Sequence, residues 1–273
     1  MKIFPVCPIF VPANKLDWVP KILASKADCI IFDLEDSILL DQKESSRRAL
    51  YDYLASNNLD ISVLIRINSL DSDIGQADLA LFSDNTEIFD ALMLPKIEEP
   101  AVLDDMPRVD VVLLIETPLA VKNLSLLAEN SQAVGIALGG ADLSASLGSD
   151  MSWNSLLFHR SRIVLEASVN NLFSIDGPFM NISSLDELEE ESLLSSKMGF
   201  NGKAAIHPVQ IDPILKAFLP TQEEVDEAKE ILAAFANADE GALAFKGKMI
   251  DLPVVKSMEK RLRLAGIDPD KFK

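Results

Sequence analysis

The chain contains few of the residues on which thiol and imidazole chemistry depends. Its 273 residues include two cysteines and two histidines. Cys7 and Cys29 lie in apolar segments, a pattern typical of reduced core thiols in an intracellular protein, and we expect neither a disulfide framework nor a cysteine zinc site. His159 falls inside a predicted helix and His207 precedes a proline, so both are interpreted as structural. A histidine zinc site and a Ser-His-Asp triad are therefore not expected.

The chain is also short of positive charge and of long apolar runs. It has 25 Lys and Arg against 43 Asp and Glu, a net charge of −18. This excess argues against a nucleic-acid or membrane partner but leaves room for a local anion site. No apolar run approaches the roughly 18 residues of a membrane helix. Residues 1–4 begin like a signal peptide, but Pro5, Pro8 and Pro12 interrupt the apolar stretch and no small-residue cleavage site follows. We expect a first β-strand there and a cytoplasmic protein.

What the chain has instead is a regular alternation of short aliphatic runs and longer amphipathic segments. With 48% hydrophobic residues it can bury a sizeable core, and the alternation is typical of βα units around a parallel sheet. The predicted strands are residues 8–11, 29–34, 62–68, 91–94, 111–116, 133–138, 172–175 and 204–206. The predicted helices between them are residues 16–27, 41–56, 75–81, 118–129, 151–170 and 185–199. Asp41 is expected to form a capping box with Glu44, and Gly199 to end the helix that begins near residue 185.

Eight strands alternating with helices favour a (β/α)8 barrel over an open sheet. A dinucleotide-binding fold needs a Gly-rich turn after the first strand, and no glycine follows it here. We predict an α/β fold with a TIM barrel over residues 1–220. Residues 221–273 are predicted to form a C-terminal extension, a lid or an arm onto a neighbouring subunit and not an independent domain. Its helices are predicted at 222–237 and 253–265, around a Gly-punctuated segment at 241–250.

Seven of the eight predicted strands end at, or shortly before, a polar side chain that could do chemistry. In a (β/α)8 barrel the active site lies at the carboxyl ends of the strands, so these groups are expected to share one face. Scattered surface charge would not select the same end of each strand. The side chains are those of Asp33, Glu35, Asp36, Arg66, Asn68, Lys96, Glu116, Asp142, Asp176 and His207.

Glu116 and Asp142 each follow an aliphatic run, where an unpaired buried charge would be very costly. Two such carboxylates near Arg66 would suit a hydrated Mg²⁺ or Mn²⁺ ion that holds an anionic substrate, while the arginine pairs with the substrate carboxylate. Such a metal would stabilise an enolate or alkoxide formed by carbon–carbon cleavage. Each residue has a simpler interpretation. Glu116 or Asp142 could cap the helix that follows it, and Arg66 could pair with the acidic residues 33–36.

Several short motifs run through nearly the whole chain in a fixed order. They are FVPANK at 10–15, FDLEDS at 32–37, DQK at 41–43, IRIN at 65–68, MLPK at 93–96, LIET at 114–117, RSR at 160–162, GKAAIHPVQI at 202–211 and GKMIDLP at 247–253. On this ordered set the chain resembles the HpcH/HpaI aldolase/citrate lyase family, in particular its citrate-lyase-β-like proteins and its malyl-CoA and citramalyl-CoA lyases. Any one motif is weak, but the set is specific.

The resemblance implies a (β/α)8 barrel that makes or breaks a carbon–carbon bond between a 2-oxo acid or aldehyde acid and an acyl-thioester enolate. By likeness, Glu116 and Asp142 would bind Mg²⁺, and Arg66 would act on the substrate carboxylate, with Glu116 also at the substrate. The implied activity is a Mg²⁺-dependent lyase that cleaves a malyl-, citramalyl- or citryl-CoA type of 3-hydroxyacyl-CoA to an acyl-CoA and a 2-oxo acid or related small acid.

The resemblance also assigns residues outside the predicted metal site. Asp251 would be the acid/base residue, reaching the site of an adjacent subunit in a homotrimer or hexamer. Lys15 would face the phosphates of coenzyme A. Glu35 and Asp36 would orient waters or the metal beside the substrate.

The chain departs from the family pattern in two places, which leaves its natural substrate open. The sixth strand usually ends in Gly-x-Glu-Asp, whereas here Ala141 precedes Asp142. Residues 176–183 lack a second acidic residue often present after the seventh strand. Alternatives are a citrate lyase β subunit acting on an acyl-carrier-protein thioester, a thioester hydrolase or malate-synthase-like enzyme, and a protein that binds CoA and a 2-oxo acid without turnover.

Overall fold

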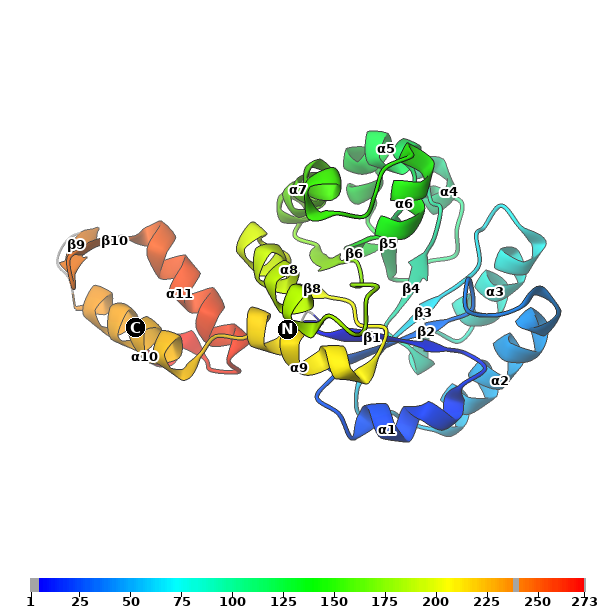
Figure 1. The fold of residues 1–273 in the computed structure, drawn as a ribbon, viewed down its shortest axis with the longest axis horizontal. Helices are drawn as coiled ribbons and strands as arrows, with labels where there is room; N and C mark the ends of the chain where they lie inside the picture. The colour runs from blue at the N-terminus through cyan, green and yellow to red at the C-terminus, as the bar shows by residue number, and fades with distance from the viewer. Residues whose placement is uncertain (1–4, 238–240, 273) are drawn as a thin grey trace. The chain divides into compact units, whose positions relative to one another are not determined.

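The computed structural model describes residues 5–237 and 241–272, so residues 1–4, whose signal-peptide-like start was considered above, lie outside the described chain. The described chain divides into two compact units, one ending at Leu215 and the other beginning at Lys216 (Figure 1). Each unit has its own core, and each is described by itself below.

The first unit is built on a sheet of eight strands within the described residues, all parallel and hydrogen-bonded in sequence order. The strands are β1 (Pro8–Pro12), β2 (Cys29–Asp33), β3 (Ser62–Arg66), β4 (Ala91–Leu94), β5 (Val111–Ile115), β6 (Ala133–Leu138), β7 (Phe173–Asp176) and β8 (Gly202–Lys203). The last of them lies earlier than predicted. The Ala204 amide after it donates to the Asp176 carbonyl of β7 at 3.0 Å, and Ala205 bonds to β1. The Phe10 amide donates to the Ala205 carbonyl at 2.9 Å, and the Ala205 amide donates to the Pro8 carbonyl at 2.8 Å. These bonds close the predicted TIM barrel.

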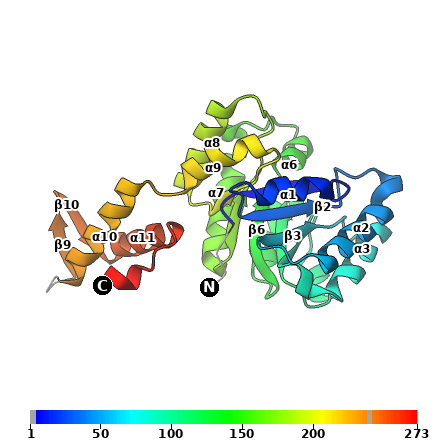
Figure 2. The same ribbon diagram turned by 90° about the horizontal axis from the view of Figure 1, so that it is seen from below.

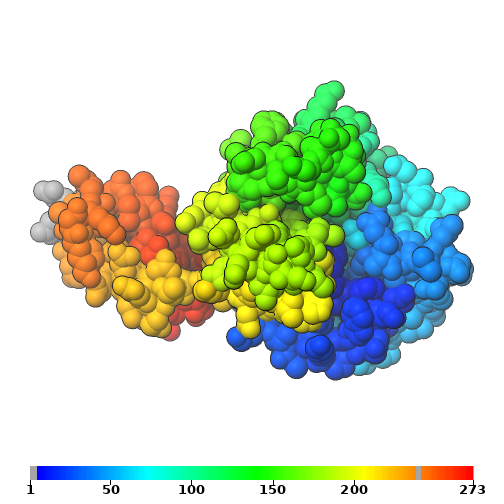
Figure 3. All heavy atoms as spheres, in the orientation of Figure 1, coloured from blue at the N-terminus to red at the C-terminus, as the bar shows by residue number. Residues whose placement is uncertain are grey.

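Helices surround these strands in two perpendicular views (Figures 1 and 2). Figure 3 shows the same face as Figure 1 with all heavy atoms drawn, where residues of this unit, coloured from blue through green to yellow, pack against one another. The helices are α1 (Val19–Leu23), α2 (Lys43–Ser56), α3 (Asp73–Ser83), α4 (Pro100–Asp104), α5 (Pro118–Ala128), α6 (Gly140–Leu147), α7 (Trp153–Asn170), α8 (Leu185–Met198) and α9 (Ile211–Phe218), the last spanning the boundary at Leu215.

Two details of the predicted helices are wrong. The capping box on α2 does not form, because Asp41 lies inside a 3₁₀ turn, Leu40–Gln42, and so lacks the extended backbone that an N-cap requires. The predicted helix at 16–27 is divided into a 3₁₀ turn, Leu16–Trp18, and the short α1, which ends where the Ser25 hydroxyl donates to the Ile22 carbonyl at 2.6 Å. Gly199, in contrast, ends α8 as predicted, with a left-handed φ of 113°.

The inside of the barrel is filled with aliphatic side chains. Ile31, Leu64, Met93, Leu114 and Ile175 belong to one buried cluster, together with the small residues Ala137 and Ala204. Because an alanine fills less space than the isoleucine or leucine of a neighbouring strand, β6 and the segment after β8 leave room at the carboxyl end of the barrel. That room becomes the cavity described below.

The described residues of the second unit form the helices α10 (Gln222–Ala236) and α11 (Leu252–Leu264), a β-hairpin of β9 (Ala242–Phe245) and β10 (Lys248–Asp251), and a last 3₁₀ turn, Pro269–Phe272. Its first helix begins with a capping box formed by Thr221 and Glu224. The hairpin was not predicted. It turns at Lys246 and Gly247, which both have positive φ (46° and 79°), as in the two-residue turns that suit twisted strands. Among the described residues, no helix is both long and apolar enough to cross a membrane.

Candidate active site

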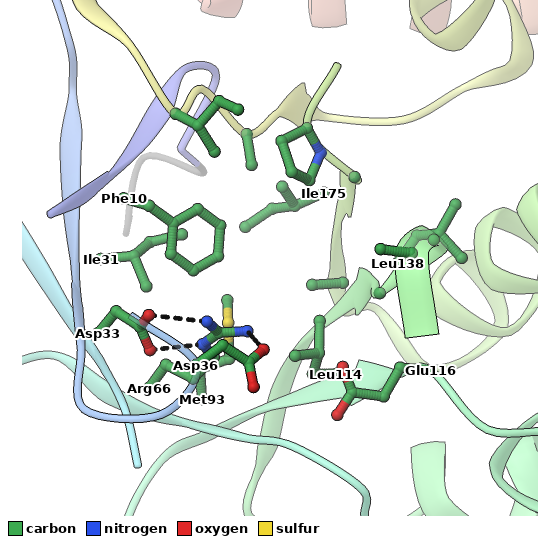
Figure 4. A pocket seen from close by; sticks show the side chains of 18 of the residues that line it. Phe10, Ile31, Asp33, Asp36, Arg66, Met93, Leu114, Glu116, Leu138 and Ile175 are labelled. Carbon is green, nitrogen blue, oxygen red and sulfur yellow. Dashed lines mark hydrogen bonds and ion pairs between the residues drawn. The ribbon is translucent and has the colours of Figure 1, made fainter. Parts of the chain in front are cut away.

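A cavity of about 520 Å³ opens at the carboxyl end of the barrel strands. Polar residues that line it include Asp33, Asp36, Arg66, Glu116, Asp142 and Asp176, and apolar ones include Phe10, Ile31, Met93, Leu114, Leu138 and Ile175. In Figure 4, Arg66 lies between Asp33 and Asp36, with the Phe10 ring beside its guanidinium and Glu116 farther across the cavity. The predicted gathering of polar groups at this end of the strands is therefore present for these residues.

Arg66, the last residue of β3, pairs with Asp33 at the end of β2 and with two acids on the loop that follows. Its Nε donates to Asp33 Oδ1 at 2.7 Å and its Nη2 to Asp33 Oδ2 at 2.8 Å. Its Nη1 lies 3.3 Å from both Glu35 Oε2 and Asp36 Oδ2. Burial raises the pKa of Asp33, but the hydrogen bonds and charge of Arg66 outweigh it and hold the pKa below its usual value. The ion-pair interpretation of Arg66 is thus confirmed, and the Nη1 side of its guanidinium is the side that faces Asp36.

Glu116 follows β5 and is 1% exposed. Its Oε1 accepts a hydrogen bond from the Lys96 backbone N–H at 2.9 Å. On its other side lies Gly139, where an added Cβ would stand 2.4 Å from Glu116 Cβ and 2.7 Å from Oε2. The glycine is therefore required for the carboxylate to occupy this position.

The two capping interpretations are wrong. The N-cap of α5 is Thr117, whose hydroxyl accepts from the Ala120 amide at 3.1 Å, so Glu116 is not needed there. Asp142 is the third residue of α6, inside the helix that follows Gly139, and not its N-cap. Both carboxylates remain available for another partner.

The electrostatics of Glu116 indicate a missing positive charge. Its pKa is raised from 4.5 to about 8, first by burial and then by the negative charges of Glu35 and Asp142, and the positive charges of Arg66 and Lys96 offset this rise only in part. A divalent cation beside Glu116 and Asp142 would favour the ionised carboxylate, and carboxylate oxygens are the ligands that Mg²⁺ prefers. No group of three or more His, Cys, Asp and Glu in the described chain could hold a metal by itself. Two carboxylates plus water molecules fit a Mg²⁺ ion, which keeps part of its hydration.

Glu35 and Asp36 lie on the loop after β2, next to Arg66. Glu35 is buried, and its Oε1 accepts from the Lys96 ammonium at 2.8 Å. Its Oε2 is also buried and finds no hydrogen-bond partner among the described residues. The Lys43 ammonium fixes this loop by donating to the carbonyls of Leu34, at 2.8 Å, and Glu35, at 2.5 Å. The Asp36 side chain is 56% exposed and thus free to move from Arg66.

The structure does not bring every predicted residue into the cavity. Lys15 is exposed on the loop after β1 and is not among the lining residues, although Trp18, three residues later, lines the cavity. Asn68 is held by Asp78, whose Oδ2 accepts hydrogen bonds from both the backbone N–H and the side-chain Nδ2 of Asn68. His207 Nδ1 accepts from the Val209 amide at 3.2 Å, in agreement with its structural interpretation.

Asp251, the last residue of β10, belongs to the second unit. It is the N-cap of α11, where its Oδ1 accepts from the Val254 amide at 3.3 Å. Its side chain is half-buried within that unit.

Sequence reasoning missed a second set of buried charges around Asp176. Asp176 is wholly buried and accepts from Arg160 Nε at 2.9 Å, from Lys203 Nζ at 2.7 Å and from the Ser195 hydroxyl at 2.6 Å. Lys203 Nζ also lies 2.7 Å from Glu191 Oε1 and donates to the Gly177 carbonyl at 2.7 Å. Although Asp176 borders the cavity, its carboxylate is occupied by these residues and therefore stabilises the barrel by joining β7, β8, α7 and α8. The pairing is visible only in the strand register, which places Lys203 on β8 directly opposite Asp176 on β7.

The fold and the cavity define a TIM-barrel protein with an acidic, cation-demanding site at the carboxyl ends of its strands. The family model of the HpcH/HpaI aldolase/citrate lyase family matches residues 7–208, and the chain belongs to this family of carbon–carbon lyases. The resemblance read from the motifs is thereby confirmed.

Named relatives cover almost the whole chain. A citrate lyase subunit beta-like protein of Mycobacterium tuberculosis is 33% identical, over 94% of each chain. The mitochondrial citramalyl-CoA lyase of Rattus norvegicus is 30% identical, over 94% of this chain and 85% of its own. Among solved structures, the protein CitE of Mycobacterium tuberculosis, in complex with magnesium, acetoacetate and coenzyme A, has a TM-score of 0.84 and 30% identity, covering 97% of this chain and 100% of its own.

Proposed function

We propose that the protein is a Mg²⁺-dependent lyase that cleaves a 3-hydroxyacyl-CoA thioester of the malyl-, citramalyl- or citryl-CoA type to an acyl-CoA and a 2-oxo acid. The observation that carries the proposal is the buried carboxyl of Glu116, which lines the same cavity as Asp142 and Arg66. Its pKa is raised, so a cation in the cavity would be needed to keep it ionised near neutral pH. The family and the magnesium and coenzyme A bound to the related CitE protein support the proposal.

Glu116 and Asp142 would hold the metal, and Mn²⁺ could replace Mg²⁺. When bound, the cation would supply positive charge that stabilises the deprotonated hydroxyl oxygen on the carbon whose carbon–carbon bond breaks. Arg66 binds the substrate carboxylate through its Nη1 side, because Asp33 already occupies Nε and Nη2. The exposed Asp36 gives way to that carboxylate, while Glu35 stays behind it and orients water. The apolar side chains of the cavity exclude bulk water from the reacting atoms.

Asp251 would act as the acid/base residue on the site of an adjacent subunit. As a base it takes the proton of the substrate hydroxyl, the carbon–carbon bond breaks, and a proton returned to the enolate carbon completes the acyl-CoA.

Beside Asp251, Met249 and Leu252 expose 74% and 58% of their surface, which supports contact with another chain. Charge supports it too. Residues 216–273 hold 10 basic and 11 acidic residues, against 15 and 32 in residues 1–215. A nearly neutral extension can approach a strongly acidic barrel, as in a homotrimer or hexamer.

Lys15 would contact the phosphates of coenzyme A. It is an exposed cation, and the cavity-lining residues Pro12 and Trp18 lie three residues before and after it in the chain. An exposed lysine can reach a phosphate as a flexible point charge.

The proposed activity is tested with a panel of CoA thioesters, with Mg²⁺ present, by following the release of free 2-oxo acids. We expect turnover of at least one malyl- or citramalyl-type ester, its loss in Glu116→Gln, and its retention in Glu129→Gln, a matched exposed glutamate at the end of α5. Full activity after chelation, together with full activity of Glu116→Gln, would refute the role of the metal. If only acyl-carrier-protein thioesters are turned over, the substrate carrier is the acyl-carrier protein and not CoA. If thioesters bind without any turnover, the proposed lyase activity is refuted.

The proposed role of Asp251 has its own test. Glu116→Gln and Asp251→Asn are each expected to be inactive, and unfolding and refolding them together should restore activity. With random mixing, about a quarter of the sites combine an intact barrel with an intact neighbouring extension. If the mixture stays inactive while refolded wild-type protein recovers, Asp251 does not act across subunits.

A further inference from the structure

Lys96 has a backbone conformation that a lysine seldom adopts. It follows β4 and has a φ of 53°, in the left-handed region. For a residue with a side chain this conformation costs on the order of 1–3 kcal/mol, and it persists only where the surroundings enforce it. Pro95 before it and Ile97 after it are both buried, so the chain is anchored on either side. The strain points to a function for the groups that Lys96 presents.

The two donors of Lys96 contact two different buried glutamates. Its backbone N–H donates to Glu116 Oε1 at 2.9 Å, and its ammonium donates to Glu35 Oε1 at 2.8 Å. Glu116 follows β5 and Glu35 follows β2, so one residue after β4 connects acids from both sides of the cavity. In each case Lys96 occupies one oxygen of the carboxylate, and the second oxygen of Glu35 lies 3.3 Å from Arg66 Nη1.

We propose that Lys96 is a positioning residue, whose left-handed backbone turns its N–H toward Glu116 and so orients that carboxylate for the divalent cation. The inference rests on the proposed Mg²⁺ site. The Lys96 side chain is 42% exposed, and an ion pair with such a partner contributes little to stability. A purely structural ion pair would not need the strained backbone, whereas the bond from the N–H to Glu116 does. The ammonium adds the matching restraint on Glu35.

Two substitutions separate the backbone from the ammonium. Lys96→Asn and Lys96→Ile both remove the charge, but asparagine tolerates a positive φ and a β-branched isoleucine does not. The Mg²⁺ dissociation constant of the full chain is measured by calorimetry, with Mg²⁺ as the only ligand. We expect Lys96→Ile to bind Mg²⁺ roughly 10- to 100-fold more weakly than Lys96→Asn, the range found when a group that orients a metal ligand is lost. Equal dissociation constants in the two variants would overturn the proposal.

A second measurement covers the case in which the isoleucine variant does not fold. In the metal-free wild-type protein, the residue-96 amide should exchange its hydrogen slowly because Glu116 accepts it, and exchange should accelerate in Glu116→Ala. Fast exchange in the wild type, or no change in Glu116→Ala, would overturn the proposal without any Lys96 variant. A wild-type protein that binds no Mg²⁺ but shows slow, Glu116-dependent exchange would refute the proposed metal site and keep the hydrogen bond, so the two failures are distinguishable.

Discussion

Glu116 should make the metal-free protein lose stability as the pH rises. In the unfolded chain this carboxyl has the ordinary pKa of 4.5, whereas burial, Glu35 and Asp142 raise its pKa to about 8 in the folded protein. Between these two values the folded state holds a proton that the unfolded state has released. The free energy of unfolding therefore falls as the pH increases, which is the sign expected when the native state binds more protons.

The size of the effect follows from the two pKa values. The slope approaches about 1.4 kcal/mol per pH unit inside this window and levels off above a pH of about 8. From about pH 6 to pH 8 the metal-free protein should lose about 2 kcal/mol through Glu116. The pKa of Asp33 and that of Asp176 are held below their usual values, so their contributions change below this range.

The assay is urea unfolding at several pH values in the presence of a chelator, followed by tryptophan fluorescence. Both tryptophans, Trp18 and Trp153, lie in the barrel, so the signal reports this unit alone. In Glu116→Gln the fall should disappear, while groups such as His159 contribute equally to both proteins. Saturating Mg²⁺ should remove the fall in the wild type as well, because it favours the ionised carboxylate. Parallel curves for the wild type and Glu116→Gln without metal would show that Glu116 holds no extra proton in the folded state.

Two further predictions follow from the packing of the barrel. Lys203→Met should destabilise the barrel by about 3 kcal/mol in the same fluorescence assay, because it leaves the buried Asp176 short of one of its two cations, and an unchanged urea midpoint would contradict this. Gly139→Ala should weaken Mg²⁺ binding roughly 10- to 100-fold in calorimetry, because the added Cβ would displace Glu116. The control is Gly241→Ala, whose Cβ would meet no described atom within 4 Å and which should leave Mg²⁺ binding unchanged. Equal affinities of the two variants would show that Glu116 tolerates displacement.

Seven of the eight described strands could be predicted because a buried parallel strand needs a continuous aliphatic run, and each of these runs is visible in the chain. The exception is β8, whose two residues, Gly202 and Lys203, form no such run; the prediction placed it at 204–206. The position of the cavity followed from the barrel itself, since polar residues placed just after these runs must meet at one end. Glu116, Asp142 and Arg66 could be identified in this way because each is a charge next to residues that exclude water.

Other features depend on contacts that no local pattern encodes. Lys203 is a lysine on a two-residue strand, and its burial became evident only when the register placed it opposite Asp176. The left-handed backbone of Lys96 is set by its buried neighbours and not by lysine itself. Asp41 and Glu44 have the spacing of a capping box, but the 3₁₀ turn before α2 overrides this local preference.

The central claim is that Glu116 and Asp142 together bind the divalent cation of the site. Crystals grown with Mn²⁺ in place of Mg²⁺ test it most directly, because the anomalous scattering of manganese locates the ion without reference to activity. We expect a single strong peak in the cavity, roughly 2 Å from a carboxylate oxygen of Glu116 and of Asp142, with water completing the coordination. A cavity without a peak, or a peak that contacts neither carboxylate, would contradict it.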